Sequence, residues 1–369
     1  MRPESLNPPD PRSKGIVAVY PDGSERGVGK WHRIAALFFA LALCASMFHS
    51  PAHAATTVDG QDEAGWGVVR PWDTFYSVTV LPSGRWFSVG AEGVLLTSAD
   101  AGKTWNRRRL AKRGDLSWYD LFSIRFASDG RTGYIGGERG IILKTDDGGQ
   151  TWSQQKTGTE ELIFRVVPID AQRAVAAGSN GLLMWTDDGG RNWHSQTFKA
   201  GITFFDAAFS DPSNGWAVGE FATIAHSSDG GKTWQLQTGG DRAKFRLPAY
   251  MTVVFKDAQH GWAAGQGGVI VGTEDGGQSW HPVQTSTDLA LYALLVPPNP
   301  AGTLWVAGDE GALIKMSTTG GTEPQVSKPT FSSLTAVAFA GDIGVTVGTD
   351  GTLLRSEDGG KSWHAVQTR

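Results

Sequence analysis

The chain has 369 residues, with 49 glycines, 15 tryptophans, one cysteine and a formal net charge of -4. Abundant glycine and large aromatic residues favour many short strands and turns over long helices. The single cysteine excludes a disulfide framework, and the mild acidity argues against a nucleic-acid partner.

The N-terminal part carries an export signal. The apolar run IAALFFALALCASMF at 34–48 follows Arg33 and precedes Ala52-His53-Ala54. A basic flank, a short apolar stretch and an Ala-x-Ala site are typical of a secretory signal peptide. We expect residues 1–54 to be an extension and signal peptide cleaved after Ala54, which makes the protein periplasmic or secreted. An uncleaved membrane anchor is the alternative.

The mature chain must be stabilised by its core. Removing six basic and four acidic residues with the leader reduces the totals of 33 and 37 to 27 and 33, a net charge of -6, and leaves no cysteine. An exported chain without cysteine has no disulfides, and 315 residues are enough for a large core. Residues 55–74 lead into a repeated region at 75–369.

An octapeptide recurs along this region. It reads SADAGKTW at 98, TDDGGQTW at 145, TDDGGRNW at 186, SSDGGKTW at 227, TEDGGQSW at 273 and SEDGGKSW at 356, with a degenerate copy, STTGGTEP, at 317–324. Its third position falls at 100, 147, 188, 229, 275, 319 and 358, in steps of 47, 41, 41, 46, 44 and 39 residues. A period near 40 to 50 residues with strand-like content indicates propeller blades.

Each repeat contains further strand signals in a fixed order. An alternating apolar strand opens it, as in LFSIRF at 121, and a strand, tight turn and strand follow, as in GWAVGEFATIAHS from 215. With the strand after the octapeptide this makes a four-stranded antiparallel blade. The sequence therefore predicts an all-β, seven-bladed β-propeller over 75–369. We expect GWGVVRP at 65–71 to add a strand that helps to close the ring.

The octapeptide is interpreted as scaffold. Its Asp can accept hydrogen bonds within its own turn, its glycines permit positive φ, and its Trp can pack between sheets. An active site is normally built once, whereas this turn recurs, and it has too few acids for a calcium loop. The structural residues are Asp100, Trp105, Asp147, Trp152, Asp188, Trp193, Asp229, Trp234, Asp275, Trp280, Asp358 and Trp363.

The pattern S/T-x-D-x-G-x-x-W is the Asp-box, or BNR repeat, which occurs in sialidases, xyloglucan-degrading hydrolases, sortilin-type receptors and photosystem II assembly factors. With stretches such as GYIGGERGIILKTDDGGQTW at 133–152, the mature chain most resembles the photosystem II stability/assembly factor family of exported seven-bladed propellers. That resemblance implies a non-catalytic role in binding or assembly, related to photosynthesis, with a membrane or envelope complex as the partner. It implies no cofactor and no metal, and we expect a monomer.

Partner binding in photosynthetic members of that family involves a cluster of arginines on one face. Two basic stretches of this chain, NRRRLAKRG at 106–114 and DRAKFRL at 241–247, are interpreted as long inter-blade connections on the face opposite the Asp-boxes. Charges on an edge strand that deter sheet pairing are the alternative. Reversal of Arg107, Arg108, Arg109 and Arg246 to Glu is expected to abolish binding without unfolding the ring. The candidate partner-binding residues are Arg107, Arg108, Arg109, Lys112, Arg113, Arg242, Lys244 and Arg246.

Other polar residues are predicted near the central channel. Turns between second and third strands would place Glu92, Glu138, Glu220, Asp309, Glu310 and Asp350 in an inner acidic ring. Arg125, Arg165 and Asp206 interrupt apolar inner strands, either as a mutually satisfied cluster or as a ligand site. A glycan remains a possible ligand, with Trp118 and Tyr119 near one mouth of the channel.

The alternative function is a sialidase-like glycoside hydrolase. Sialidases carry an Arg-Ile-Pro segment, and its only matches in this chain are weak ones, Phe164-Arg165-Val166-Val167-Pro168 and Phe245-Arg246-Leu247-Pro248. Sialidases also use a tyrosine nucleophile, but the five tyrosines of the mature chain lie in or beside predicted strands. No HExxH or G-x-S-x-G motif exists, and His194, His281 and His364 follow Asp-box tryptophans. We therefore expect no catalytic activity.

Overall fold

The computed structural model describes residues 17–19, 25–27, 61–62, 69–110, 118–198, 201–239, 247–297, 302–318 and 324–366. The chain divides into two compact units, Met1–Ala52 and His53–Arg369. In the first unit, β1 (Val17–Val19) pairs with β2 (Glu25–Gly27) in antiparallel fashion. The predicted signal sequence at 34–54 lies outside the described residues. Within the described ranges, no helix has the length and apolarity needed to cross a membrane.

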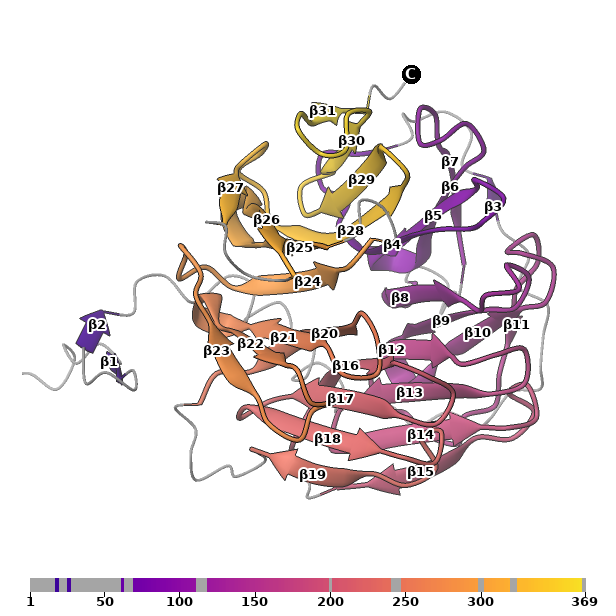
Figure 1. Cartoon of the computed structure of the whole chain (residues 1–369). Coiled ribbons are helices and arrows are strands. Elements are labelled where there is room, and N and C mark those ends of the chain that lie inside the picture. The colour runs from indigo at the N-terminus through magenta and orange to yellow at the C-terminus, as the bar shows by residue number, and fades with distance from the viewer. Residues whose placement is uncertain are drawn as a thin grey trace, which may run out of the picture. The chain divides into compact units, whose positions relative to one another are not determined.

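The second unit is a seven-bladed β-propeller, as predicted (Figure 1). Each blade is an antiparallel sheet in which consecutive strands are neighbours. The inner strands are β4 (Phe75–Val80), β8 (Leu121–Phe126), β12 (Ile163–Pro168), β16 (Phe204–Phe209), β20 (Tyr250–Phe255), β24 (Leu291–Leu295) and β28 (Leu334–Ala340). All seven inner strands expected from the sequence are therefore present.

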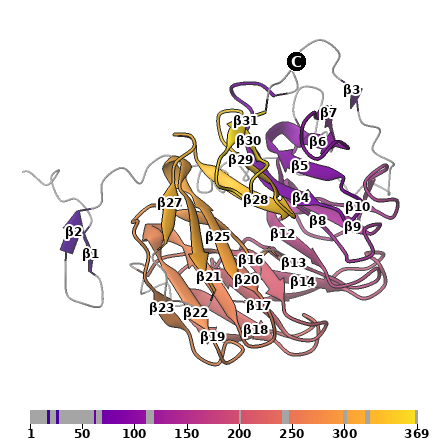
Figure 2. The same ribbon diagram turned by 45° about the horizontal axis from the view of Figure 1, so that its top comes forward.

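The remaining strands complete the blades outward, as Figure 2 shows for the fifth blade. The second strands are β5 (Trp86–Gly90), β9 (Gly133–Gly137), β13 (Ala174–Gly178), β17 (Gly215–Gly219), β21 (Gly261–Gly265), β25 (Thr303–Gly308) and β29 (Ile343–Gly348). The third are β6 (Val94–Ser98), β10 (Ile142–Thr145), β14 (Leu182–Thr186), β18 (Thr223–Ser227), β22 (Ile270–Thr273), β26 (Leu313–Ser317) and β30 (Leu353–Ser356). The fourth are β7 (Asn106–Arg109), β11 (Ser153–Gln154), β15 (His194–Thr197), β19 (Gln235–Thr238), β23 (His281–Val283), β27 (Gln325–Ser327) and β31 (His364–Ala365).

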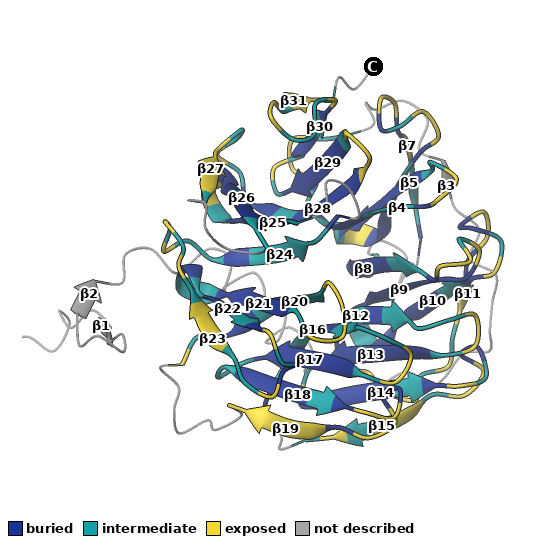
Figure 3. Ribbon diagram, viewed as in Figure 1, coloured by how far each residue is buried: buried dark blue, intermediate teal, exposed yellow. Residues whose placement is uncertain are grey.

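Burial follows the position of each strand in its blade (Figure 3). All five residues of β5 and of β17 are buried, whereas all four residues of β19 are exposed. Second strands lack polar alternation because blades pack on both of their faces, while an outer strand has solvent on one side. The core therefore consists of apolar clusters between neighbouring blades.

Inner strands are joined to one another by side chains at their third position. The Ser77 hydroxyl accepts a hydrogen bond from the amide of Ile124 at 3.3 Å, and the Ser123 hydroxyl accepts one from the amide of Val166 at 3.2 Å. The register of each inner strand against its second strand shifts at this position, for example between Phe75 and Ser77. This bulge turns the third side chain toward the next blade.

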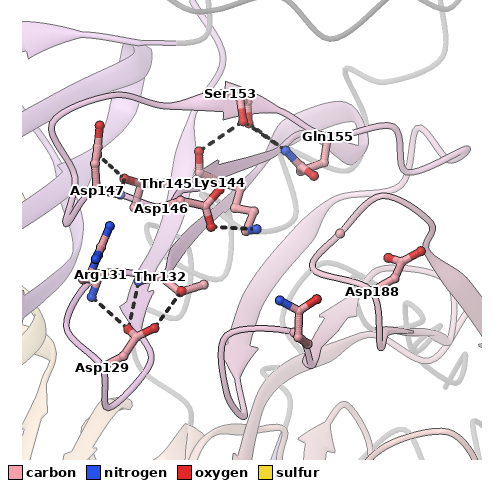
Figure 4. A network of polar contacts seen from close by, with 12 residues as sticks. Asp129, Arg131, Thr132, Lys144, Thr145, Asp146, Asp147, Ser153, Gln155 and Asp188 are labelled. Carbon is pink, nitrogen blue, oxygen red and sulfur yellow. Dashed lines mark hydrogen bonds and ion pairs between the residues drawn. The ribbon is translucent and has the colours of Figure 1, made fainter.

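The Asp-box turns share one hydrogen-bond pattern, seen at Asp147 (Figure 4). The Thr145 hydroxyl donates to the Asp147 carboxylate at 2.7 Å, which also accepts the Thr151 amide at 2.9 Å. Partial burial acts to raise the pKa of Asp147, but hydrogen bonds from Thr151, Thr145 and Gln150 outweigh it and lower the pKa to about 2. The carboxylate therefore stays ionised and holds its turn closed.

Each Asp-box Trp packs toward the preceding blade. Trp152 of the second blade is 1 % exposed and lies in one cluster with Phe87 of the first, and Trp105 of the first blade lies with Val345 of the last. The degenerate sixth repeat still forms four strands, and residues 319–323 of its turn lie outside the described residues. An Asp-box Trp thus links blades at six of the seven interfaces. Between blades five and six, where Pro324 stands at that position, Trp262 of the fifth blade lies in one buried cluster with Leu304 of the sixth.

The segment GWGVVRP at 65–71, expected to add a closing strand, is described only in its last three residues. Residues 69–71 form no strand, and 63–68 lie outside the described residues. β3 (Gln61–Asp62) adds a fifth strand outside β7. The Gly351 amide of the last blade donates to the Asp73 carbonyl at 2.7 Å, as the Gly140 amide donates to Glu161. Residues 69–74 therefore take the place of a seventh inter-blade connection.

Candidate protein-binding face

The propeller has two faces of different construction. On the first, which we call the Asp-box face, Asp-box glycines donate to the turn between the first and second strands, as Gly148 does to Arg131 at 2.9 Å. On the other, the connection face, turns between second and third strands meet the segments that lead into the inner strands. There the Ala222 amide donates to the Pro248 carbonyl at 2.7 Å. Turns alternate between faces because the strands of a blade are antiparallel.

Part of the predicted acidic ring has a scaffold role on the connection face. The Glu138 carboxylate accepts the Asp120 amide at 3.2 Å, and the Glu220 carboxylate accepts the Thr203 amide at 2.8 Å. Ser179 makes the same bond with its hydroxyl, to the Leu162 amide at 3.0 Å. These side chains therefore anchor the turn of a blade to the start of its inner strand.

The other acidic residues differ in exposure. Asp309 accepts a hydrogen bond from the Ser333 hydroxyl at 2.5 Å, which fixes it locally. Glu92, Glu310 and Asp350 occupy the middle of their turns with φ of 54°, 49° and 55°, and all three are exposed. All three carboxylates lie at the surface, where Glu92 forms an ion pair with Arg109 and Glu310 forms one with Lys328.

Only three residues of the predicted basic cluster are described, and all three are engaged within the protein. Arg107, Arg108 and Arg109 belong to β7 itself, not to the connection after it, and β3 pairs with that strand. The β7 edge is therefore covered, and protection of a free edge is not their role. Lys112, Arg113, Arg242, Lys244 and Arg246 lie outside the described residues.

Each arginine of β7 has its own partner. Arg107 lies 3.1 Å from the Asp73 carboxylate, with 7 % and 6 % of the two side chains exposed. Arg108 donates to the Gly149 carbonyl at 2.9 Å, in the Asp-box turn of the second blade. Arg109 lies 2.7 Å from Glu92, on the connection face. Reversal of Arg107 would place two carboxylates together in a buried position, so we now expect this reversal to destabilise the ring.

The inner strands line the channel with aromatic and charged side chains. Tyr76, Phe122, Phe164 and Phe205 follow one another around four blades, with centroid separations of 5.6, 5.2 and 5.4 Å. Each is the second residue of its inner strand. No single repeat signals this row, which becomes visible in the sequence only when the inner strands are aligned at their first residue.

The charged residues of the inner strands, Arg125, Arg165 and Asp206, all have partners within the protein. Arg165 Nε lies 2.6 Å from Asp206, which also accepts the Val253 amide at 3.1 Å. Arg125 donates to the Ser77 hydroxyl at 3.1 Å. Burial and repulsion by Arg165 lower the pKa of Arg125 to about 9, against the attraction of Asp206. The structure therefore shows the satisfied cluster that was one of the two sequence interpretations.

Burial shifts the pKa of several titratable side chains of the blades. The Tyr76 hydroxyl donates to Asp120 at 3.2 Å, and burial, followed by the charge of Asp120, raises the pKa of Tyr76. Burial likewise raises the pKa of Tyr292 and lowers that of His226. No group of three or more potential metal ligands occurs among the described residues.

Comparisons with known proteins identify the type of propeller. A family profile described as "Photosynthesis system II assembly factor YCF48" matches residues 72–200 and 196–323. Among curated protein sequences none matches. The structure described as "YCF48 bound to D1 peptide" is 23% identical, with a TM-score of 0.61, over 83% of this chain and 96% of its own.

Two further solved structures resemble the chain. YCF48 from Cyanidioschyzon merolae is 18% identical, with a TM-score of 0.60, over 82% of this chain and 99% of its own. A GH74 xyloglucanase from Xanthomonas campestris is 13% identical, with a TM-score of 0.61, over 82% of this chain and 54% of its own. At these identities the structural likeness shows the fold alone.

Proposed function

Because this chain belongs to the YCF48 family of photosystem II assembly factors, we propose that it is a non-catalytic propeller that docks a protein partner during assembly of a membrane or envelope complex. The family match over residues 72–323 is the observation that carries this proposal. A relative of the same family has been solved with a D1 peptide bound, which supports a protein as the class of ligand.

A non-catalytic role agrees with the state of the candidate hydrolase residues. Arg165, the arginine of the weak sialidase-like match, is an inner-strand residue bonded to Asp206. Tyr76 and Tyr292 have raised pKa values, which disfavours the phenolate that a tyrosine nucleophile needs. Xyloglucanases of the same fold do not alter this proposal, since a propeller fold is shared by proteins of many functions.

We place the partner on the connection face and the protein outside the cytoplasm. On the Asp-box face the third-position Asp of each complete box is bonded to its own turn, as at Asp147 and Asp229, and the large exposed aromatic side chains of the described residues lie on the other face. The connection face differs between blades and carries exposed carboxylates and aromatic residues. Export rests on the signal-peptide pattern at 34–54 in the sequence.

Affinity purification tests the proposal. The tagged mature chain is incubated with detergent-solubilised envelopes of its host, and a tag-only sample is the control. We expect a subunit of a membrane complex to be recovered with the protein and not with the tag. Recovery of no envelope protein, together with binding on a carbohydrate array, would replace this proposal with a glycan-binding function.

A further inference from the structure

The segments that lead into the inner strands share one position that is aromatic before three neighbouring blades only. It lies three residues before the first residue of each inner strand. In blade order it is occupied by Trp72, Trp118, Glu160, Gly201, Leu247, Asp288 and Phe331. The aromatic members precede blades seven, one and two, so they form an arc on the connection face. Phe331 is 94 % exposed and Trp72 is 66 % exposed.

A second position is acidic in the same part of the ring. The middle residue of the turn between second and third strands is, in blade order, Glu92, Arg139, Asn180, Phe221, Gly267, Glu310 and Asp350. The carboxylates therefore belong to blades six, seven and one. Phe331 and Trp118 lie on the segments that leave blades six and one, and Trp72 lies on the segment at 69–74 that takes the place of a connection from blade seven.

Each acidic turn adjoins one aromatic segment. Gly351, after Asp350, donates to the carbonyl of Asp73, which follows Trp72, at 2.7 Å. A Cβ on Gly311, after Glu310, would lie 1.9 Å from the carbonyl oxygen of Thr330, which precedes Phe331. The backbone of the ring thus brings an acidic turn and an aromatic segment side by side at neighbouring blades, and we call each such combination an acid–aromatic pair.

The third pair, Glu92 with Trp118, already holds a cation of the protein itself. The Arg109 guanidinium lies 2.7 Å from the Glu92 carboxylate, and its Cζ lies 5.8 Å from the centroid of the Trp118 ring. A carboxylate and an aromatic face together bind a guanidinium by charge and by cation–π attraction. This pair shows which chemistry the arrangement recognises.

The other two pairs remain accessible. Asp350 is exposed, accepts a hydrogen bond from Thr349 at 3.2 Å and forms no ion pair with any described residue. Glu310 lies 3.4 Å from Lys328, with 64 % and 45 % of the two side chains exposed. A surface ion pair of this kind is weak, so a second cation can join or replace it.

We propose that the pairs Asp350 with Trp72 and Glu310 with Phe331 form an acid–aromatic arc that binds a basic segment of a partner protein, one arginine or lysine side chain to each pair. The inference rests on the proposed function only in taking the ligand to be a protein. The arc would bind a basic segment, whereas the basic cluster predicted from the sequence would bind an acidic one. We favour a basic segment because the three arginines of β7 are engaged within the protein.

Peptide binding tests the arc directly. Fluorescein-labelled octapeptides of alternating arginine and serine, lysine and serine, or glutamate and serine are titrated against the mature protein, with anisotropy as the readout. We expect saturable binding of the basic peptides and none of the acidic one. Two double variants, Asp350→Asn with Glu310→Gln and Trp72→Ala with Phe331→Ala, are each expected to weaken binding about tenfold.

Matched control variants separate the arc from general charge attraction. Asp187→Asn with Glu274→Gln removes two exposed acidic charges from Asp-box turns, and Leu236→Ala with Val326→Ala removes two exposed apolar side chains from outer strands. These controls should change the affinity less than about twofold. Equal losses in arc and control variants, or no binding of the arginine peptide to the native protein, would overturn the inference.

The result is independent of the proposed function. If an envelope partner is purified equally well with the native protein and with the arc variants, the inference fails and the proposed function stands. If the basic peptides bind through the arc but no envelope partner is recovered, the proposed function fails and the arc stands.

Discussion

The Thr335 hydroxyl in the last inner strand donates a hydrogen bond to the Phe75 carbonyl in the first, at 2.6 Å. No strand is exchanged between the two ends of the ring in the described part of the chain, since β28 to β31 and β4 to β7 each form a blade from consecutive residues. Side chains and the segment at 69–74 therefore hold the ring closed, which makes this junction sensitive to single substitutions.

Thr335→Val should weaken the closure, because it removes the hydroxyl and keeps the shape of the side chain. We expect the free energy of unfolding to fall by about 1 kcal/mol. Ser153→Ala is the control, because it removes a hydroxyl whose two contacts, to Lys144 at 3.4 Å and from Gln155 at 3.2 Å, lie within one outer part of a blade and not across the junction. Chemical denaturation measures both, and an equal effect of the two substitutions would contradict a special role of the junction.

Trp152→Ala should strongly destabilise the ring, because Trp152 is 1 % exposed between the first and second blades. Truncation of a buried Trp costs about 3 to 5 kcal/mol. Trp72→Ala removes the same side chain at a position that is 66 % exposed, and it should leave the melting temperature nearly unchanged. Similar melting temperatures for the two variants would refute the interpretation of the Asp-box Trp as a staple.

Acid should destabilise the protein through its Asp-boxes. The pKa of Asp100, Asp147, Asp188 and Asp275 is lowered to about 2 in the folded protein. A carboxyl whose folded pKa lies below its unfolded value near 3.9 stabilises the fold above that value, and this stabilisation is lost as the pH falls through the folded pKa. We expect the melting temperature to drop between about pH 4 and pH 2, and thermal melts across this range that stay constant would contradict it.

Ala222→Gly should stabilise the protein. Ala222 has φ of 53°, whereas the other six blades place glycine at the same position of the turn. The left-handed conformation costs a residue with a Cβ about 1 to 2 kcal/mol, and glycine avoids this cost. Glycine also loses more conformational entropy on folding, which cancels part of the gain. We expect a gain of about 0.5 to 1 kcal/mol in the free energy of unfolding.

The reciprocal substitution, Gly311→Ala, is the control for this turn. Gly311 has φ of 72°, and a Cβ there would lie 1.9 Å from the Thr330 carbonyl oxygen. It should lower the free energy of unfolding by more than about 1 kcal/mol. Denaturation of both variants tests the pair, and destabilisation by Ala222→Gly would show that the alanine has a packing role.

The blades could be predicted from the sequence because the octapeptide and the apolar inner strand repeat at nearly constant spacing. Each inner strand was located to within one residue, from LFSIRF at Leu121–Phe126 to FFDAAF at Phe204–Phe209. Glycine and Asp at fixed offsets mark a turn with a local hydrogen-bond pattern, so tertiary contacts are not needed to recognise it.

The site was less predictable because its contacts join residues far apart in sequence. Arg107 meets Asp73 from another segment, and Arg108 meets Gly149 of another blade. Neither contact has a local signal, so a run of arginines was interpreted as a free basic surface. The acid–aromatic arc could have been found from the sequence, but only after Trp72 and Phe331 were aligned by their distance from the inner strand.

The central claim is that a protein partner docks on the connection face. Site-specific photo-crosslinking tests it most directly, with p-benzoyl-phenylalanine in place of Phe331 on that face or of Gln150 on the Asp-box face, both of which are exposed. We predict that irradiated envelopes yield a crosslinked envelope protein from position 331 and none from position 150. Adducts from position 150 alone, equal adducts from both positions, or none from either would contradict the claim.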